Sequence, residues 1–135
     1  MTPKPVSPSR PTKRFTLEEA NSALPLVKRI AADVVKTHQQ VFNLRSEVAS
    51  AGTKDQAAKE SQYNRAVERF QGYVAELKAI GCELKDPKLG LVDFLSRFQG
   101  RDIYLCWKLG EEQIDFWHEI SAGFADRQPV AALRA

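Results

Sequence analysis

Five polar side chains in the C-terminal half of the chain are of the kinds that bind metals or anions: Asp93, Cys106, His118, Glu119 and Arg127. Zinc and other transition metals accept thiolate, imidazole and carboxylate ligands, so Cys106, His118 and Glu119 form a candidate metal site. Their spacing matches no established metal motif, because His118-Glu119 does not open a His-Glu-x-x-His sequence. The structural alternative is that Cys106 fills space on a strand and His118 hydrogen-bonds locally.

A nucleophilic pair is a second use of the same residues. An imidazole close to a thiol can hold it as the thiolate, so Cys106 and His118 could act together if they are neighbours. No oxyanion-hole sequence or glycine-rich phosphate loop accompanies them. We therefore assign no catalytic residue.

A small-ligand site is a third use of this region. Arg127, which lies between Gly123 and Pro129, could receive an anion or could pair with an acidic neighbour. Tryptophan rings could stack on a ligand, although aromatic side chains in small domains more often belong to the core. The candidate ligand-binding residues are Asp93, Trp107, Trp117 and Arg127.

A small antiparallel sheet is predicted to position these side chains. Residues 91–98 and 101–108 are rich in aromatic and aliphatic side chains, and Gly100 between them can supply the positive φ of a tight hairpin. Residues 111–120 place Ile114 and Trp117 along one side of a helix, with acidic residues at the start that favour the helix dipole. We therefore expect a short third helix after the hairpin.

Two long amphipathic helices are predicted before the sheet. Thr16 and Glu19 have the Thr-x-x-Glu spacing of a capping box, so the first helix should begin there. Apolar residues recur at spacings of three and four from Val27 to Val48, and again from Tyr63 to Ile80. A short polar turn joins the two stripes, which indicates an antiparallel helical hairpin. The predicted fold class is therefore α+β.

The chain is predicted to form one domain behind a basic arm. Its 135 residues, 43% hydrophobic and 27% charged, suit a single globular unit. Residues 1–14 hold four prolines and four basic side chains and no acidic one, which predicts a disordered arm. The domain should span residues 15–130, with the helical hairpin over 15–81, the β-hairpin and short helix over 82–130, and a tail over 131–135.

Composition argues against several classes of partner. The basic arm accounts for the net charge of +3, and cations without interleaved aromatic residues are a weak signal for nucleic acid. No apolar run approaches the roughly 20 residues that cross a bilayer, and the N-terminal segment has no signal-peptide pattern. Cys82 and Cys106 are expected to stay reduced. We therefore expect a cytoplasmic protein that binds neither membrane nor nucleic acid.

Recognisable motifs run through both halves of the chain. The first is Phe15-Thr16-Leu17-Glu18-Glu19-Ala20-Asn21, followed by Leu24-Pro25-Leu26-Val27. The others are Gly90-Leu91-Val92-Asp93-Phe94, Tyr104-Leu105-Cys106-Trp107-Lys108-Leu109-Gly110-Glu111, and Trp117-His118-Glu119 running on to Gly123-Phe124-Ala125-Asp126-Arg127-Gln128-Pro129. Together they resemble an uncharacterised prokaryotic family, the domain-of-unknown-function family 2203. The resemblance covers nearly the whole chain and implies no activity or site residue.

Two functional hypotheses of different classes follow. The first is a non-enzymatic assembly or adaptor module, which self-associates through its helical hairpin as a homodimer and serves an unidentified protein partner. The width that Leu24, Val35 and Phe42 add to the apolar face favours it. The second is a protein that binds a small ligand or a metal such as zinc, with enzymatic activity left open. Its site would lie between the β-hairpin and Trp117-His118-Glu119.

Overall fold

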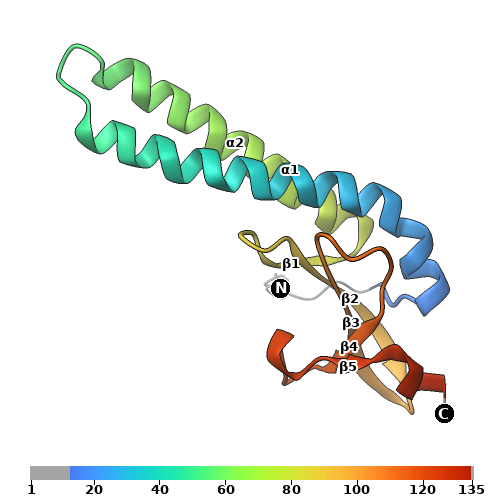
Figure 1. The fold of residues 1–135 in the computed structure, drawn as a ribbon. Coiled ribbons are helices and arrows are strands. Elements are labelled where there is room, and N and C mark those ends of the chain that lie inside the picture. The colour runs from blue at the N-terminus through green and yellow to red at the C-terminus, as the bar shows by residue number, and fades with distance from the viewer. Residues whose placement is uncertain (1–12, 135) are drawn as a thin grey trace, which may run out of the picture.

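A computed structural model describes residues 13–134 as a long helical hairpin that lies across one side of a small sheet (Figure 1). The sheet is antiparallel and has five strands in the order β1-β2-β3-β4-β5. The predicted α+β class, with two long helices before an antiparallel sheet, is confirmed. The elements are α1 (Leu17–Ser50), α2 (Gln56–Ile80), β1 (Glu83–Asp86), β2 (Leu91–Phe98), β3 (Arg101–Lys108), β4 (Phe116–Glu119), η1 (Phe124–Asp126), β5 (Gln128–Pro129) and η2 (Val130–Arg134).

Local signals set the ends of the helices and the turn of the hairpin. Thr16 Oγ1 accepts from the Glu19 N–H at 3.1 Å and Glu19 Oε1 accepts from the Thr16 N–H at 2.9 Å, which completes the capping box. Gly81 ends α2 in the left-handed region with a φ of 109°. Gln99 and Gly100 have φ values of 51° and 77°, as a two-residue hairpin turn requires.

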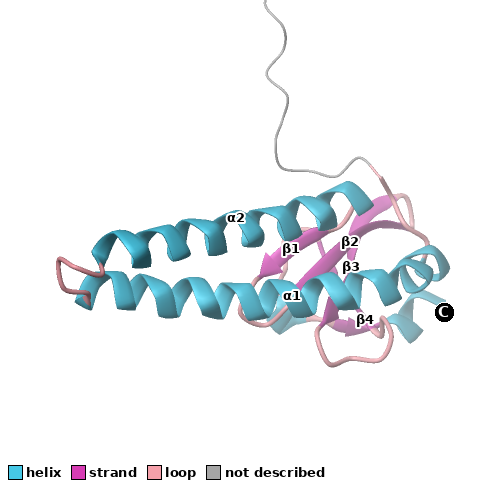
Figure 2. Cartoon of the chain, turned by 90° about the horizontal axis from the view of Figure 1, so that it is seen from above, coloured by secondary structure: helices cyan, strands magenta, loops and turns pink. Residues whose placement is uncertain are grey.

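The two faces of the sheet have different surroundings. Because side chains alternate along a strand, Val92, Leu105 and Trp117 project to the helix-facing side. There they join one core cluster with residues of the helices, including Val27 and Leu77. The view from above shows both helices over this side of the sheet (Figure 2). The opposite face carries Asp93, Cys106 and His118.

The short helix predicted over residues 111–120 is wrong. The segment is a loop followed by strand β4, in which Phe116 pairs with Cys106 and His118 pairs with Tyr104. Ile114 and Trp117 are both buried, so their spacing of three was a true core signal. Ile114 turns inward from the loop and Trp117 turns inward from β4, without a helix, and the helices that follow are short 3-10 segments.

The hairpin is packed at one end only. The buried residues of α1 lie between Ala20 and Thr37, and those of α2 are Ala66 and Leu77. Residues 38–65, all within the described part of the chain, include no buried residue. We call residues 38–65 the distal hairpin; it extends beyond the sheet (Figure 2). Neither long helix has the length of apolar sequence that a membrane crossing needs, in the part of the chain that the structure describes.

Helix α1 contains Pro25 in its first half and continues through it without a break. Leu24 and Val27 on either side are buried in the core, which holds the helix together where the proline removes a hydrogen bond. Most of the predicted N-terminal arm, residues 1–12, lies outside the described residues. Its last residue, Arg14, makes two hydrogen bonds with the carboxylate of Asp102, at 2.8 and 3.1 Å.

Candidate metal site

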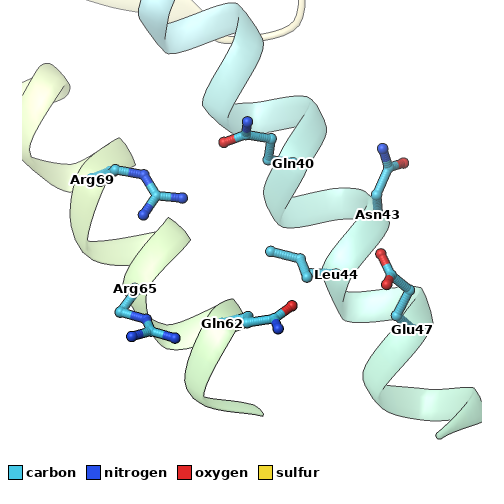
Figure 3. Close-up of a pocket in the computed structure, with 7 residues that line it drawn as sticks. All are labelled: Gln40, Asn43, Leu44, Glu47, Gln62, Arg65 and Arg69. Atoms are coloured by element: carbon cyan, nitrogen blue, oxygen red, sulfur yellow. The ribbon is translucent and has the colours of Figure 1, made fainter. Parts of the chain in front are cut away.

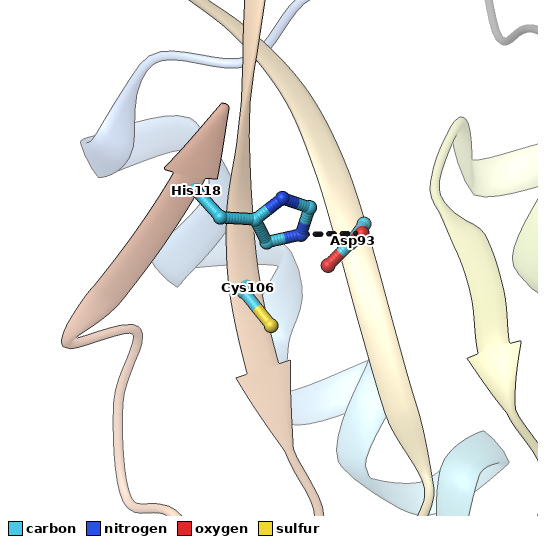
Figure 4. A group of neighbouring side chains, drawn as sticks. All are labelled: Asp93, Cys106 and His118. Atoms are coloured by element: carbon cyan, nitrogen blue, oxygen red, sulfur yellow. Dashed lines mark hydrogen bonds and ion pairs between the residues drawn. The ribbon is translucent and has the colours of Figure 1, made fainter. Parts of the chain in front are cut away.

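Three adjacent strands bring Asp93, Cys106 and His118 together on the face away from the helices (Figure 4). Asp93 on β2 lies directly opposite Cys106 on β3, and the His118 ring reaches in from β4. One donor atom from each side chain lies within 4.8 Å of the other two. The three residues are 1%, 0% and 3% exposed, so water screens little of their interaction.

Both ring nitrogens of His118 are engaged. Nδ1 lies 2.8 Å from the backbone carbonyl of Glu119, and Nε2 lies 2.9 Å from Asp93 Oδ2. A carbonyl oxygen only accepts, so Nδ1 must carry a hydrogen and donate it. A second proton must then lie between Nε2 and the carboxylate, because two lone pairs would otherwise face each other. His118 and Asp93 therefore hold a proton between them.

The surroundings of His118 favour the imidazolium form. Burial acts to lower the pKa of His118, but the hydrogen bonds with Asp93 and with the Glu119 carbonyl, together with the negative charge of Asp93, outweigh it. The pKa of His118 is therefore raised above its usual value, which agrees with the proton that the geometry places between His118 and Asp93. His118 and Asp93 form a buried ion pair in this state.

A nucleophilic Cys106–His118 pair is not supported by this geometry. Burial, the charge of Asp93 and a hydrogen bond with Asp93 raise the pKa of the Cys106 thiol to about 12, although nearby Arg127 acts to lower it. The thiol is therefore protonated at neutral pH. Since His118 uses both nitrogens elsewhere, it has none left to deprotonate the thiol or a substrate.

The same geometry suits a metal ion. Histidines that bind metals usually donate their other N–H to a carbonyl or carboxylate, as Nδ1 does here, and this fixes Nε2 as the ligand atom. Asp93 Oδ1 is buried and has no hydrogen-bond partner among the described residues. An unpaired buried carboxylate oxygen is costly, and a cation would satisfy it. Nitrogen, oxygen and sulfur together form a donor set typical of zinc.

A small cavity borders two of the three residues, Asp93 and His118. Its volume is about 120 Å³, room for a few water molecules. Asp93 and His118 line it from the sheet, and Phe124 lies on its wall. Lys85 also lines it, with its ammonium 4.7 Å from the centre of the Tyr104 ring. The site therefore has an opening large enough for a metal ion and water, and small for most metabolites.

Arg127 is held close to the site by an ion pair. Its guanidinium makes two hydrogen bonds of 3.0 Å to the Glu111 carboxylate and lies 4.1 and 4.4 Å from the ring centres of Phe116 and Phe124. Burial acts to lower the pKa of Arg127, but Glu111 outweighs it and the pKa is raised. The two hydrogen bonds occupy the guanidinium with the Glu111 carboxylate. Arg127 therefore holds the C-terminal segment against the loop after β3.

A family model described as an uncharacterized conserved protein, DUF2203, matches residues 13–130. The chain belongs to the DUF2203 family. The resemblance seen in the sequence motifs is thereby confirmed, and the matched range includes both long helices and all three strands of the candidate site. No curated protein and no solved structure matches the chain.

This DUF2203 chain brings together some of the candidate residues and separates others. Cys106 and His118, taken from the sequence as metal ligands, are neighbours; Asp93, taken as a ligand-binding residue, completes the group. Glu119 is not part of it, because adjacent residues of a strand project to opposite faces. Its carboxylate instead makes two hydrogen bonds, of 2.9 and 2.7 Å, with Arg101.

The two tryptophans proposed as ligand-binding residues lie in the core. Trp107 is fully buried, and its Nε1 donates to the Glu111 carbonyl at 2.9 Å. Trp117 belongs to the same core cluster. Sequence reasoning missed that Asp93 and Cys106 face each other, although the signal was present. In a hairpin with a tight turn, residues at equal distances from the turn are paired. Counting outward from Gln99-Gly100 by the same number of residues on each strand leads to Asp93 and Cys106.

Proposed function

We propose that this protein binds a divalent transition-metal ion of the zinc type through Asp93, Cys106 and His118. One observation carries the proposal: a buried carboxylate oxygen without a good donor lies beside an imidazole whose other nitrogen is fixed on a backbone carbonyl. The structural alternative, a buried ion pair with an apolar thiol beside it, accounts for the proton. It leaves the buried Asp93 Oδ1 without a hydrogen bond.

Metal binding at this site has to release protons. The ion would replace the proton between His118 Nε2 and Asp93, and it would bind Cys106 as the thiolate. Because the pKa of the thiol is about 12 without metal, that proton also leaves only when the ion arrives. About two protons should therefore be released for each ion bound at neutral pH, and affinity should rise with pH.

The test is to measure metal uptake by the full chain. Protein purified without chelator is analysed for its metal content, and metal-free protein is titrated with zinc in two buffers of different ionisation enthalpy, which gives the number of protons released. We expect one ion per chain, and greatly weakened binding in His118→Ala and Cys106→Ser. Glu119→Gln is the matched control, because that carboxylate projects from the other face and should leave zinc binding unchanged. A folded wild-type chain that takes up no zinc would refute the proposal.

Self-association through the helical hairpin is the second candidate function, and one observation favours it. The distal hairpin has no buried residue, and the ring of Phe42 is 67% exposed. A short two-helix segment with so little packing gains little stability from its own chain. A second copy packed against it would supply the missing contacts, as in a four-helix bundle.

A hollow between the helices of the distal hairpin has the mixed character that a two-fold contact needs. Its volume is about 620 Å³, and the Leu44 side chain lies between the two helices (Figure 3). Glu47 lines it from α1, and Arg65 and Arg69 line it from α2. Glu47 already pairs with Lys59 of its own chain at 2.6 Å, and in a two-fold dimer it can in addition meet the basic residues of the other copy.

Light scattering on the full chain tests self-association. We expect the mass of a dimer at tens of micromolar, and a mass that falls on dilution. A strict monomer across this range would count against an assembly role. An adaptor role for a further protein partner stays a prediction, as does the absence of enzymatic activity.

A further inference from the structure

A fourth possible donor lies beside the candidate metal site on strand β1. Glu83 pairs directly with Asp93, and directly paired residues of antiparallel strands project from the same face. Glu83, Asp93 and Cys106 therefore form a row across three neighbouring strands. Their Cβ atoms are spaced about 5 Å apart in such a row, which is within the reach of a glutamate side chain.

The carboxylate of Glu83 is also incompletely paired. Its Oε2 is buried and makes no hydrogen bond within the described residues. The Lys85 ammonium lies 3.1 Å from this oxygen, as an ion pair whose geometry is not that of a hydrogen bond. Asp93 Oδ1, in the residue directly opposite, is similarly unpaired. Two carboxylates placed opposite each other repel, so a cation between them would remove the repulsion and pair both oxygens.

Building on the proposed metal function, we infer that Glu83 is the fourth protein ligand and closes the coordination of the ion. The set would be Glu83, Asp93, Cys106 and His118. Zinc sites with four protein ligands are structural, whereas catalytic sites keep one position open for water or substrate. The ion would then fasten the short strand β1 to β2, β3 and β4 and would take no part in a reaction.

The charges around such a centre balance. Two carboxylates and one thiolate carry three negative charges, and a divalent ion neutralises two of them. The Lys85 ammonium, already close to Glu83, supplies the remaining positive charge. Its position over the Tyr104 ring keeps it at the border of the cavity that Asp93 and His118 also line.

Cobalt(II) in place of zinc reports the number of ligands by its visible absorption. We expect the wild-type chain to give the intense bands of a four-coordinate ion, with a thiolate charge-transfer band from Cys106. In Glu83→Gln, water would replace the carboxylate as the fourth ligand, so the visible bands should shift while the thiolate band remains. The affinity for zinc should fall by about 10-fold or more.

Two control variants separate a ligand from a residue that only supports an ion pair. Lys85→Gln removes the same ion pair but keeps the carboxylate, so its cobalt bands should stay at the wild-type positions. Glu83→Asp keeps a shorter carboxylate and should bind zinc more tightly than Glu83→Gln. Circular dichroism of each metal-free variant establishes that it is folded.

The inference fails if Glu83→Gln binds zinc as tightly as the wild type and gives the same cobalt spectrum. It fails equally if Lys85→Gln shifts the visible bands as much as Glu83→Gln does. Both results leave the three-residue site standing, since the wild type still binds metal. A wild-type chain that takes up neither zinc nor cobalt instead overturns the proposed function itself, so the two failures are distinguishable.

Discussion

The outer face of the sheet and the distal hairpin leave opposite kinds of group unsatisfied. On the sheet, charged and polar side chains are buried, and carboxylate oxygens of Glu83 and Asp93 lack hydrogen bonds. On the distal hairpin, apolar side chains such as Phe42 remain in contact with water. A buried carboxylate is best satisfied by a cation, and an exposed apolar face by another protein surface. The comparison is the reason we propose ligand binding for the sheet and assembly for the hairpin.

The largest effect is expected where the buried ion pair is broken. His118→Ala leaves the carboxylate of Asp93 buried without its partner, so the free energy of unfolding should fall by about 3–5 kcal/mol. Arg101→Ala removes the exposed partner of Glu119 and serves as the control, with little change expected. Urea denaturation of the metal-free proteins measures both. Equal losses of unfolding free energy in the two variants would show that the buried ion pair contributes no more to stability than the exposed one.

The two ends of the hairpin should respond differently to the same substitution. Leu77 is fully buried, so Leu77→Ala should lower the free energy of unfolding by about 2–5 kcal/mol. Leu44 in the distal hairpin is only half-buried, and Leu44→Ala should cost about 1 kcal/mol or less in a monomer. If the hairpin dimerises, the cost at Leu44 will grow with protein concentration while the cost at Leu77 changes less. Denaturation at several concentrations tests this.

The pH dependence of stability should change direction when metal is added. Without metal, the raised pKa of His118 contributes stability that is complete below the unfolded value of 6.5 and is lost as pH rises through the folded value. With zinc present, protons compete with the ion, so stability should instead increase with pH over the same window. Thermal unfolding between pH 6 and 9, with and without zinc, measures the two slopes. His118→Gln should abolish the metal-free slope.

Slopes of the same sign with and without zinc would contradict the metal assignment. The result would mean that zinc does not displace the proton between His118 and Asp93. If the dependence of stability on pH persists in metal-free His118→Gln, the group that titrates is not His118 and lies elsewhere in the protein. Each outcome therefore bears on a different step of the site's chemistry.

Local chemistry in the sequence predicted the elements better than it predicted the site. The capping box at Thr16 and the turn at Gly100 each depend on a few neighbouring residues, and both predictions are confirmed. The helix over 111–120 failed, because the spacing of Ile114 and Trp117 fits a helix and also fits a loop that enters a strand. Only pairing with the distant strand β3 decides between these two structures.

The composition of the candidate site depended on which face each side chain occupies. Cys106 and His118 were chosen by residue type alone, and cross-strand pairing is what brings them together. Glu119 was chosen beside His118 in the sequence, yet strand geometry turns its side chain to the other face. Glu83 was overlooked, because its place in the row depends on the register of β1 against β2.

The smallest effect on stability, and the most specific effect on assembly, is expected at Phe42. The ring is mostly exposed, so Phe42→Ser should change the free energy of unfolding of the monomer by no more than about 0.5 kcal/mol. Dimer formation should weaken at the same time, because the polar side chain removes apolar area from the face between copies. Sedimentation velocity measures the dimer fraction, with Leu26→Ser as the control for an exposed apolar residue outside the distal hairpin. If both variants dimerise like the wild type, the contact between copies lies elsewhere. The proposal that the distal hairpin mediates assembly would then be wrong.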